Sequence, residues 1–192
     1  MKYPRYAEIE GKKYKINTDF RVALKCNQVA KDESIGDFER ALSIIYLLFG
    51  EEGINSQEHY EKLLEMSKKY LSCGEELKES KEEPDMDYEQ DYSYIKTSFF
   101  SDYGIKLDEE KIHWWEFYNL LNGLSNSEFG NCCIFNRVRN LRNMDLSQIK
   151  DSKQKDKIKE AQDRVALKKK LTEKQKESIN QLYKDFGIEK EV

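Results

Sequence analysis

Helical spacing of apolar residues recurs along most of this 192-residue chain, and only two prolines, Pro4 and Pro84, interrupt it. Most glycines follow an apolar run of this kind, where a helix would end. The exception is AEIEGKKYKI, residues 7–16, in which apolar and polar residues alternate around Gly11. That alternation predicts a β-hairpin. We therefore expect a mainly α fold, with a helical bundle-like core and a short N-terminal β-hairpin.

The expected helices fall into groups on either side of one acidic stretch. EELKESKEEPDMD, residues 75–87, is polar and shows no periodicity, which is typical of a linker. Residues 1–74 before it are predicted to form a hairpin-plus-helices lobe. After it we expect an aromatic-rich helical core over residues 88–150 and polar, basic C-terminal helices over residues 151–192.

Capping patterns predict where several helices start and stop. DFERALSIIYLLFG has apolar residues at helical spacing and is expected to stop at Gly50; these residues are Phe38, Leu42, Ile45 and Phe49. Asp108 can cap the helix that follows it, and Ser125 with Glu128 forms a capping box for the next one. A last helix is predicted from Thr172; its apolar residues are Ile179, Leu182, Tyr183 and Phe186.

Charge is unevenly distributed along the chain. The overall net charge is −4, and charged residues make up 36% of the chain against 38% apolar residues, so long solvated faces are expected. Residues 75–91 hold nine acidic residues and two lysines, a local charge of −7. Residues 137–190 hold sixteen basic and nine acidic residues, a local charge of +7. Such segregation indicates electrostatic steering, either within the molecule or towards a partner.

The basic region raises the question of nucleic-acid binding. Acidic residues are interleaved throughout it, and only Tyr183 and Phe186 could stack on bases. This pattern favours a solvated, salt-bridged helix face over a nucleic-acid groove. Membrane association is not expected either, because no segment approaches the ~18 continuous apolar residues that would span a bilayer. The N-terminus also lacks the apolar core of a signal peptide.

Residues for catalysis or metal binding are sparse. The chain has no phosphate-binding glycine loop and no G-x-S-x-G motif, and nothing places a cysteine beside His59 or His113. One adjacent pair, Cys132 and Cys133, and two isolated cysteines do not match zinc-ligand spacing. We therefore expect a protein that is not an enzyme and holds neither metal nor cofactor. His113 is expected at a helix start near the core, and His59 on a helix surface.

The least ordinary stretch is KIHWWEFYNLLNGL, residues 111–124, which contains adjacent tryptophans. Consecutive helical residues point about 100° apart, so both indoles cannot face one inner helix equally. The apolar stripe continues from Trp114, which predicts that Trp114 is core. Trp115 and Tyr118 fall beside this stripe and are predicted to be partly accessible. Together with Phe100 and Tyr103 they are the candidate partner-binding residues, although the whole cluster could instead be core.

A resemblance adds to this interpretation. DYEQDYSYIKTSFFSDYGIKL, then HWWEFYNLLNGL, then RNMDLSQIKD resemble the small phage proteins catalogued as bacteriophage gene product fifteen. The resemblance covers about residues 88–152 well and the N-terminal part more loosely. Genes of this family lie between those for the major tail protein and the tape-measure protein, and their products are taken to be tail-assembly chaperones.

The resemblance implies a protein of the cytoplasm of the bacterial host that binds the tape-measure protein during long-tail assembly and is not retained in the virion. The major tail protein is a second expected partner. It implies no catalytic residues. A tail structural component and a nucleic-acid-binding accessory protein using the basic C-terminal helices are the alternatives, and oligomerisation stays open.

Overall fold

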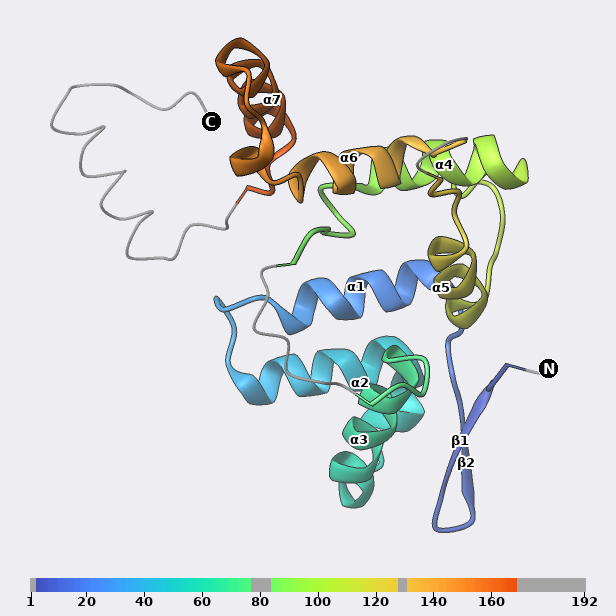
Figure 1. Ribbon diagram of the computed structural model, residues 1–192. Helices are drawn as coiled ribbons and strands as arrows, with labels where there is room; N and C mark the ends of the chain where they lie inside the picture. The colour runs from blue at the N-terminus through green and yellow to red at the C-terminus, as the bar shows by residue number, and fades with distance from the viewer. Residues whose placement is uncertain (1–2, 77–83, 128–130, 169–192) are drawn as a thin grey trace, which may run out of the picture.

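The structure is a computed structural model that describes residues 3–76, 84–127 and 131–168 (Figure 1). It confirms a mainly α fold with a two-stranded antiparallel hairpin at the N-terminus. In the described part of the chain the helices are α1 Phe20–Ala30, α2 Asp37–Ile54, α3 Tyr60–Leu71, α4 Tyr92–Tyr103, α5 Trp114–Asn122, α6 Ile134–Arg142 and α7 Ser152–Val165, with 3-10 turns at Gln57–His59 and Leu146–Gln148.

The hairpin pairs β1, Tyr6–Ile9, with β2, Lys12–Lys15, in the predicted position. Its turn has positive φ at both central residues, 51° at Glu10 and 82° at Gly11, which matches the right-handed twist of the strands. Ala7, Ile9 and Tyr14 are buried, so one face of the hairpin belongs to the core. The Tyr14 hydroxyl lies 2.6 Å from Nδ1 of His59. The prediction that His59 lies on a helix surface is therefore wrong, because this contact holds its ring against the hairpin.

Helix α2 does not stop at Gly50 as the sequence predicted. Gly50 has φ 65° and ψ −156°, a conformation that is essentially restricted to glycine, and it kinks the helix. Beyond the kink the helix resumes and ends at Ile54. The glycine was correctly recognised as an interruption, but the chain turns there and α2 continues for one further turn.

Stacked aromatic rings connect the N-terminal elements to the later helices. Phe20 of α1 stacks on Phe117 of α5, with ring centroids 4.6 Å apart. Phe117 in turn stacks on Phe99 of α4 at 5.1 Å and on Trp114 at 5.7 Å. Side chains from both sides of the expected linker therefore share one hydrophobic core. The division of the chain at residues 74 and 87 stays a prediction.

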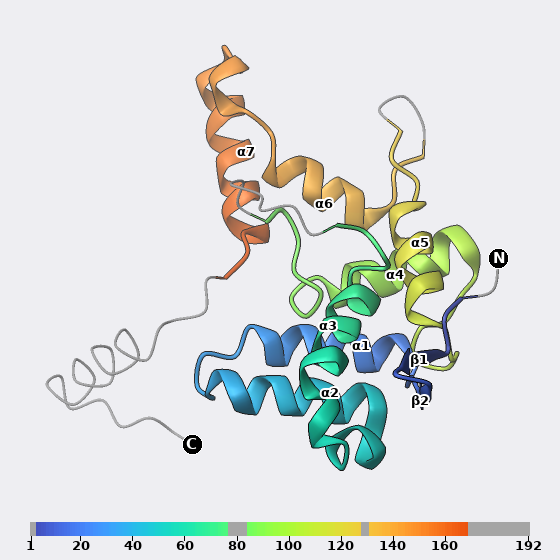
Figure 2. The same cartoon turned by 90° about the horizontal axis from the view of Figure 1, so that it is seen from below.

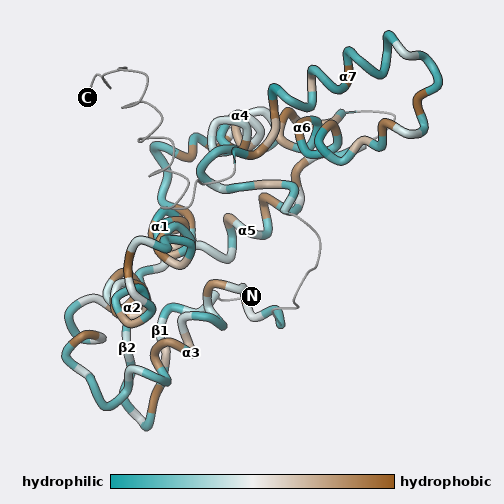
Figure 3. The backbone as a smooth tube through the Cα atoms, turned by 90° about the vertical axis from the view of Figure 1, so that its left-hand side faces the viewer, coloured by the Kyte–Doolittle hydropathy of each residue, from teal (hydrophilic) through white to brown (hydrophobic). Residues whose placement is uncertain are grey.

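Helix α6 lies beside α4, and α7 packs against α6 (Figure 2). The predicted helix start at Ser125 is wrong, because the Ser125 carbonyl accepts a hydrogen bond from the Cys133 N–H at 3.0 Å. The neighbouring Asn126 and Cys132 form an antiparallel bridge, so α6 begins only at Ile134. Figure 3 shows α7 as a largely hydrophilic helix. The helix predicted from Thr172 lies outside the described residues.

Candidate partner-binding surface

Helix α5 begins at Trp114, and its N-cap is His113, not Asp108 as the sequence predicted. The His113 Nδ1 accepts a hydrogen bond from the Trp115 N–H at 3.1 Å, and its Nε2 lies 2.9 Å from the Pro4 carbonyl oxygen. A ring nitrogen that accepts leaves the proton on the other one, so Nε2 donates to Pro4. Asp108 instead forms an ion pair with Lys96 of α4. His113 therefore lies at the helix start beside the core, as predicted.

Trp114 is a core residue, which confirms its prediction. Its side chain is only 2% exposed, and its Nε1–H donates to the Leu71 carbonyl oxygen at 3.1 Å. The ring also contacts Phe117 and Tyr88. This tryptophan therefore packs α5 against α3 and against the segment that leads into α4.

Trp115 and Tyr118 are half-buried and remain partly accessible, as predicted. The Trp115 Nε1–H donates to the Tyr70 carbonyl oxygen at 2.9 Å, and the two rings stack at 6.3 Å. A Cβ added at Gly74 would lie 3.3 Å from the Trp115 ring, so the end of α3 fits closely against the indole. The Tyr118 hydroxyl donates to the Glu75 carboxylate at 3.2 Å. Both side chains thus hold α5 to the end of α3.

Phe100 and Tyr103 lie on the last turns of α4 and are exposed. Phe100 is 57% exposed, whereas the Tyr103 hydroxyl donates to the Leu120 carbonyl oxygen of α5 at 2.9 Å. Among these four described residues, no ring contact or hydrogen bond joins this pair to Trp115 and Tyr118. Tyr103 contacts α5 at Leu120, whereas Trp115 and Tyr118 contact Tyr70 and Glu75 at and just after α3, so the two pairs have separate neighbours. Their partner-binding role stays a prediction.

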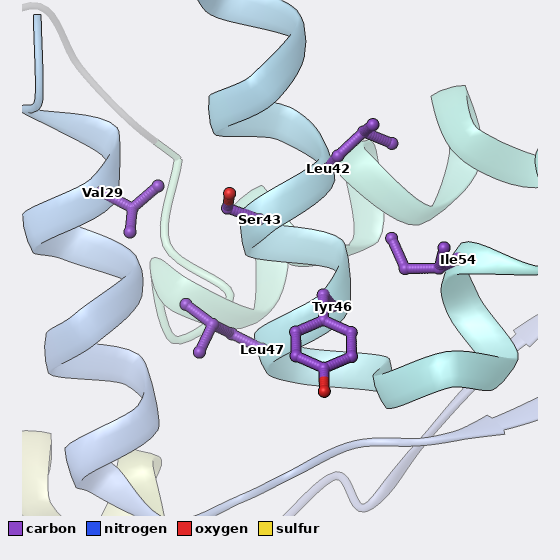
Figure 4. A pocket seen from close by; sticks show the side chains of 6 residues that line it. All are labelled: Val29, Leu42, Ser43, Tyr46, Leu47 and Ile54. Carbon is purple, nitrogen blue, oxygen red and sulfur yellow. The ribbon is translucent and has the colours of Figure 1, made fainter. Parts of the chain in front are cut away.

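A groove that the sequence did not reveal lies between α1 and α2. It has a volume of about 440 Å³; the described residues that line it are Val29, Leu42, Ser43, Tyr46, Leu47 and Ile54 (Figure 4). Tyr46 is 54% exposed, and Phe38 on the same helix is 67% exposed. The sequence grouped Phe38 with Ile45 and Phe49, but only the latter two are buried. The available signal was the run ALSIIYLLF in α2, which is too apolar to fit on one buried face.

Opposite charges from the two segregated regions meet inside the molecule. Arg142 of α6 forms an ion pair with the buried Asp91 at 2.7 Å, and Arg139 forms one with Asp85 at 2.8 Å. The hydrogen bond to the Asp91 carboxylate raises the pKa of Arg142 above its ordinary value. The charge segregation therefore acts at least partly within the chain, where it joins α6 to the segment before α4.

A second cleft, of about 720 Å³, lies beside these ion pairs. It is lined by side chains of both charges, including Lys31, Asp87, Arg142 and Lys168. Lys31 at the end of α1 pairs with Asp87 at 3.0 Å. The cleft therefore lies where α1, the acidic segment and the end of α7 come together.

Within residues 3–76, 84–127 and 131–168, no group of three or more His, Cys, Asp or Glu side chains could hold a metal ion. Burial raises the pKa of the Cys26 and Cys73 thiols to about 12, so both are protonated at neutral pH. Among the helices in those ranges, none has the length and apolar character needed to cross a membrane.

Comparison with known proteins adds one finding. The family model described as Bacteriophage Gp15 protein matches residues 2–167, which include every helix and strand of the described structure. Neither the curated proteins nor the solved structures give a significant match. Because the family model covers most of the 192 residues, the chain belongs to the bacteriophage Gp15 protein family.

Proposed function

We propose that this phage protein is a tail-assembly chaperone, which binds the tape-measure protein while a long tail is built and leaves before the virion is complete. The observation that carries the proposal is the family match over residues 2–167. The resemblance of the aromatic helix region to the family implies the same role. The site of action is the cytoplasm of the host bacterium, where tails assemble.

The expected client is a long, apolar, helical chain that must stay soluble until tube subunits surround it. Exposed aromatic side chains are suited to such a client, because they bury a large area on contact and are enriched among residues that dominate binding energy. Phe100 and Tyr103 on α4 are exposed in this way, and Trp115 and Tyr118 expose part of their rings. We assign client binding to these four residues, which form two separate patches, Phe100 with Tyr103 and Trp115 with Tyr118, and are together named the aromatic surface.

The contribution of each residue to client binding differs. Trp115 and Tyr118 already use their polar atoms within the fold, at Tyr70 and Glu75. Phe100 has no polar atom to satisfy, and more than half of its side chain faces solvent. Phe100 is therefore the residue at which truncation removes most client contact with least effect on the fold.

Release follows from mass action. Polymerising major tail protein would enclose the tape-measure protein and compete with the chaperone for the same apolar helix. Because the two compete for one site, the fraction of tape-measure protein bound to the chaperone falls as the concentration of assembling tube protein rises. The tube therefore displaces the chaperone without a chemical step. The proposal requires no catalytic residue in the chaperone.

The test is co-purification of a tape-measure fragment with the chaperone, combined with mass spectrometry of purified phage particles. The proposal predicts a soluble complex that survives moderate salt, since apolar burial is little affected by screening. It also predicts that particles lack the chaperone. A fixed copy number in particles would make the protein a structural component of the tail.

Nucleic-acid binding predicts a different salt dependence. Binding to phosphates would weaken steeply as salt rises, because counterions are released on binding. Two of the arginines in the basic region, Arg139 and Arg142, are already paired with Asp85 and Asp91. Steeply salt-dependent binding to DNA or RNA, without binding to the tape-measure fragment, would contradict the chaperone role.

A further inference from the structure

The groove between α1 and α2 is lined mainly by apolar side chains of both helices. Val29 comes from α1, Leu42, Ser43, Tyr46 and Leu47 from α2 before its kink, and Ile54 from the turn beyond Gly50. Tyr46 in the groove and Phe38 beside it are both more than half exposed. Exposed apolar side chains gathered along one helix are typical of a surface that another segment covers.

The described part of the chain ends at a cleft that also reaches the C-terminal end of α1. Lys168, its last residue, donates its N–H to Gln90 Oε1 at 2.7 Å, and Gln90 Nε2–H donates back to the Lys168 carbonyl oxygen at 3.0 Å. Lys168 and Lys31 line the same cleft. Lys31 caps α1 only two residues beyond Val29, which lines the groove.

The sequence beyond Lys168 suits the groove in its apolar pattern. Twenty-four residues follow, numbers 169–192. The helix predicted over residues 172–186 would be about 22 Å long. The three residues 169–171 could span about 10 Å when extended. The apolar residues recur at intervals of three, four and seven, which forms one helical face; they are Ile179, Leu182, Tyr183 and Phe186.

The charges of the two segments are complementary. Helix α2 carries four acidic residues and one arginine, a net charge of −3; the acidic ones are Asp37, Glu39, Glu51 and Glu52. Residues 169–186 carry five lysines and three acidic residues, a net charge of +2. Opposite charges around an apolar contact favour association and set its orientation.

We propose that the C-terminal segment docks in cis, with its Ile179, Leu182, Tyr183 and Phe186 face in the α1–α2 groove of the same chain. A segment tethered this closely acts at an effective concentration of roughly millimolar, which favours it over a separate molecule. The docked segment covers the exposed side chains of α2. The inference goes beyond the chaperone role and does not depend on it, because the occupancy of the groove is a property of the free protein.

The experiment records methyl NMR spectra of the full chain and of the Leu182→Asp variant. The expected result is a change in the signals of Val29, Leu42, Leu47 and Ile54, which line the groove, with signals of buried core residues unchanged. Gln181→Asp is the matched control, since it adds the same side chain and charge at the adjacent position, on the other side of the predicted helix. That control should leave the groove signals in place.

A reciprocal measurement uses the groove side. Tyr46→Ala should accelerate proteolytic cleavage within residues 169–192 several-fold, whereas Tyr6→Ala, at a similarly exposed tyrosine of the hairpin, should not. Unchanged groove signals in Leu182→Asp would overturn the proposal. Signals that change with protein concentration, together with dimers in sedimentation, would assign the groove to a second copy and also overturn it.

Discussion

Arg142 donates from Nη1 and Nη2 to the two carboxylate oxygens of Asp91, over distances of 2.8 and 2.7 Å. The Asp91 side chain is 1% exposed and that of Arg142 11%. The Arg142 Nε–H also donates to the Val165 carbonyl oxygen at 2.7 Å, so one guanidinium joins the start of α4, α6 and the end of α7. This relationship fixes where the chain leaves α7, and hence where the C-terminal segment begins.

Replacing this arginine should destabilise the fold strongly. Arg142→Ala would leave the Asp91 carboxylate buried and unpaired, which typically costs about 3–5 kcal/mol. Urea unfolding at neutral pH measures the loss. Arg137→Ala is the control on the same helix. Because the Arg137 side chain is exposed, this change should alter the free energy of unfolding by no more than about 0.5 kcal/mol. Equal free energies of unfolding for the two variants would mean that the buried pair contributes nothing to stability.

The two tryptophans should differ in what they contribute to stability. Trp114→Ala removes a fully buried ring and should cost about 3–5 kcal/mol. Trp115→Ala loses a half-buried ring and its hydrogen bond to the Tyr70 carbonyl oxygen, so we expect a smaller cost of about 1–3 kcal/mol. Chemical denaturation of both variants gives the comparison. A loss for Trp115→Ala as large as for Trp114→Ala would show that the adjacent indoles serve equally as core.

The four cysteines should react with a thiol reagent in a fixed order. Cys26 and Cys133 are buried, and burial raises the pKa of Cys26 and of the half-buried Cys73 to about 12. The thiolate is the reactive form, so these thiols should react slowly at mildly alkaline pH. Mass spectrometry of peptides after brief labelling should find Cys132 modified first. A Cys132→Ser variant should lose the fast phase, and rapid labelling of Cys26 would contradict the packing of α1.

Stability should fall at acidic pH in part through Asp87. Burial raises the pKa of this carboxyl, but hydrogen bonds from the Gln90 N–H and from Lys31 outweigh it and hold the pKa below the ordinary 3.8. Because the pKa is lower in the folded protein, the ionised carboxylate stabilises the fold at pH values above the pKa of the unfolded chain. This stabilisation is lost as the pH falls through the pKa of the folded protein. Urea unfolding at a series of pH values below 3.8 measures the effect. Asp87→Asn should flatten that pH dependence, whereas Asp156→Asn, on an exposed part of α7, should leave it unchanged.

Much of the fold could be predicted from periodicity, and the failures have local causes. The hairpin, α1, α3 and α4 follow from alternation and helical spacing because each buries one face. The start of α5 was missed because histidine is an unusual N-cap, and His113 acts through its ring nitrogen where Ser, Thr, Asp or Asn is preferred. The start of α6 was missed because the Ser125 carbonyl pairs with a residue eight positions away. Such pairings depend on tertiary structure.

The candidate site was predictable only in part. The angular difference between neighbouring residues separated Trp114 from Trp115, and the structure confirms that separation. The angular difference could not indicate that Trp115 contacts Tyr70, because these two residues lie 45 positions apart in the sequence. The exposure of Phe38 was also hidden, since periodicity defines the faces of a helix and tertiary packing decides which face is covered.

The tail-assembly role is tested most directly by the solubility of a tape-measure fragment co-expressed with the wild-type protein and with two matched variants. Phe100→Ala and Phe38→Ala make the same change at two exposed phenylalanines, one on the aromatic surface and one beside the α1–α2 groove. We predict that the wild type and Phe38→Ala keep the fragment soluble, and that Phe100→Ala weakens the complex by about 2 kcal/mol, a typical loss at a dominant contact. A fragment that stays insoluble with the wild-type protein would contradict the chaperone role, and a loss confined to Phe38→Ala would place the client in the groove instead.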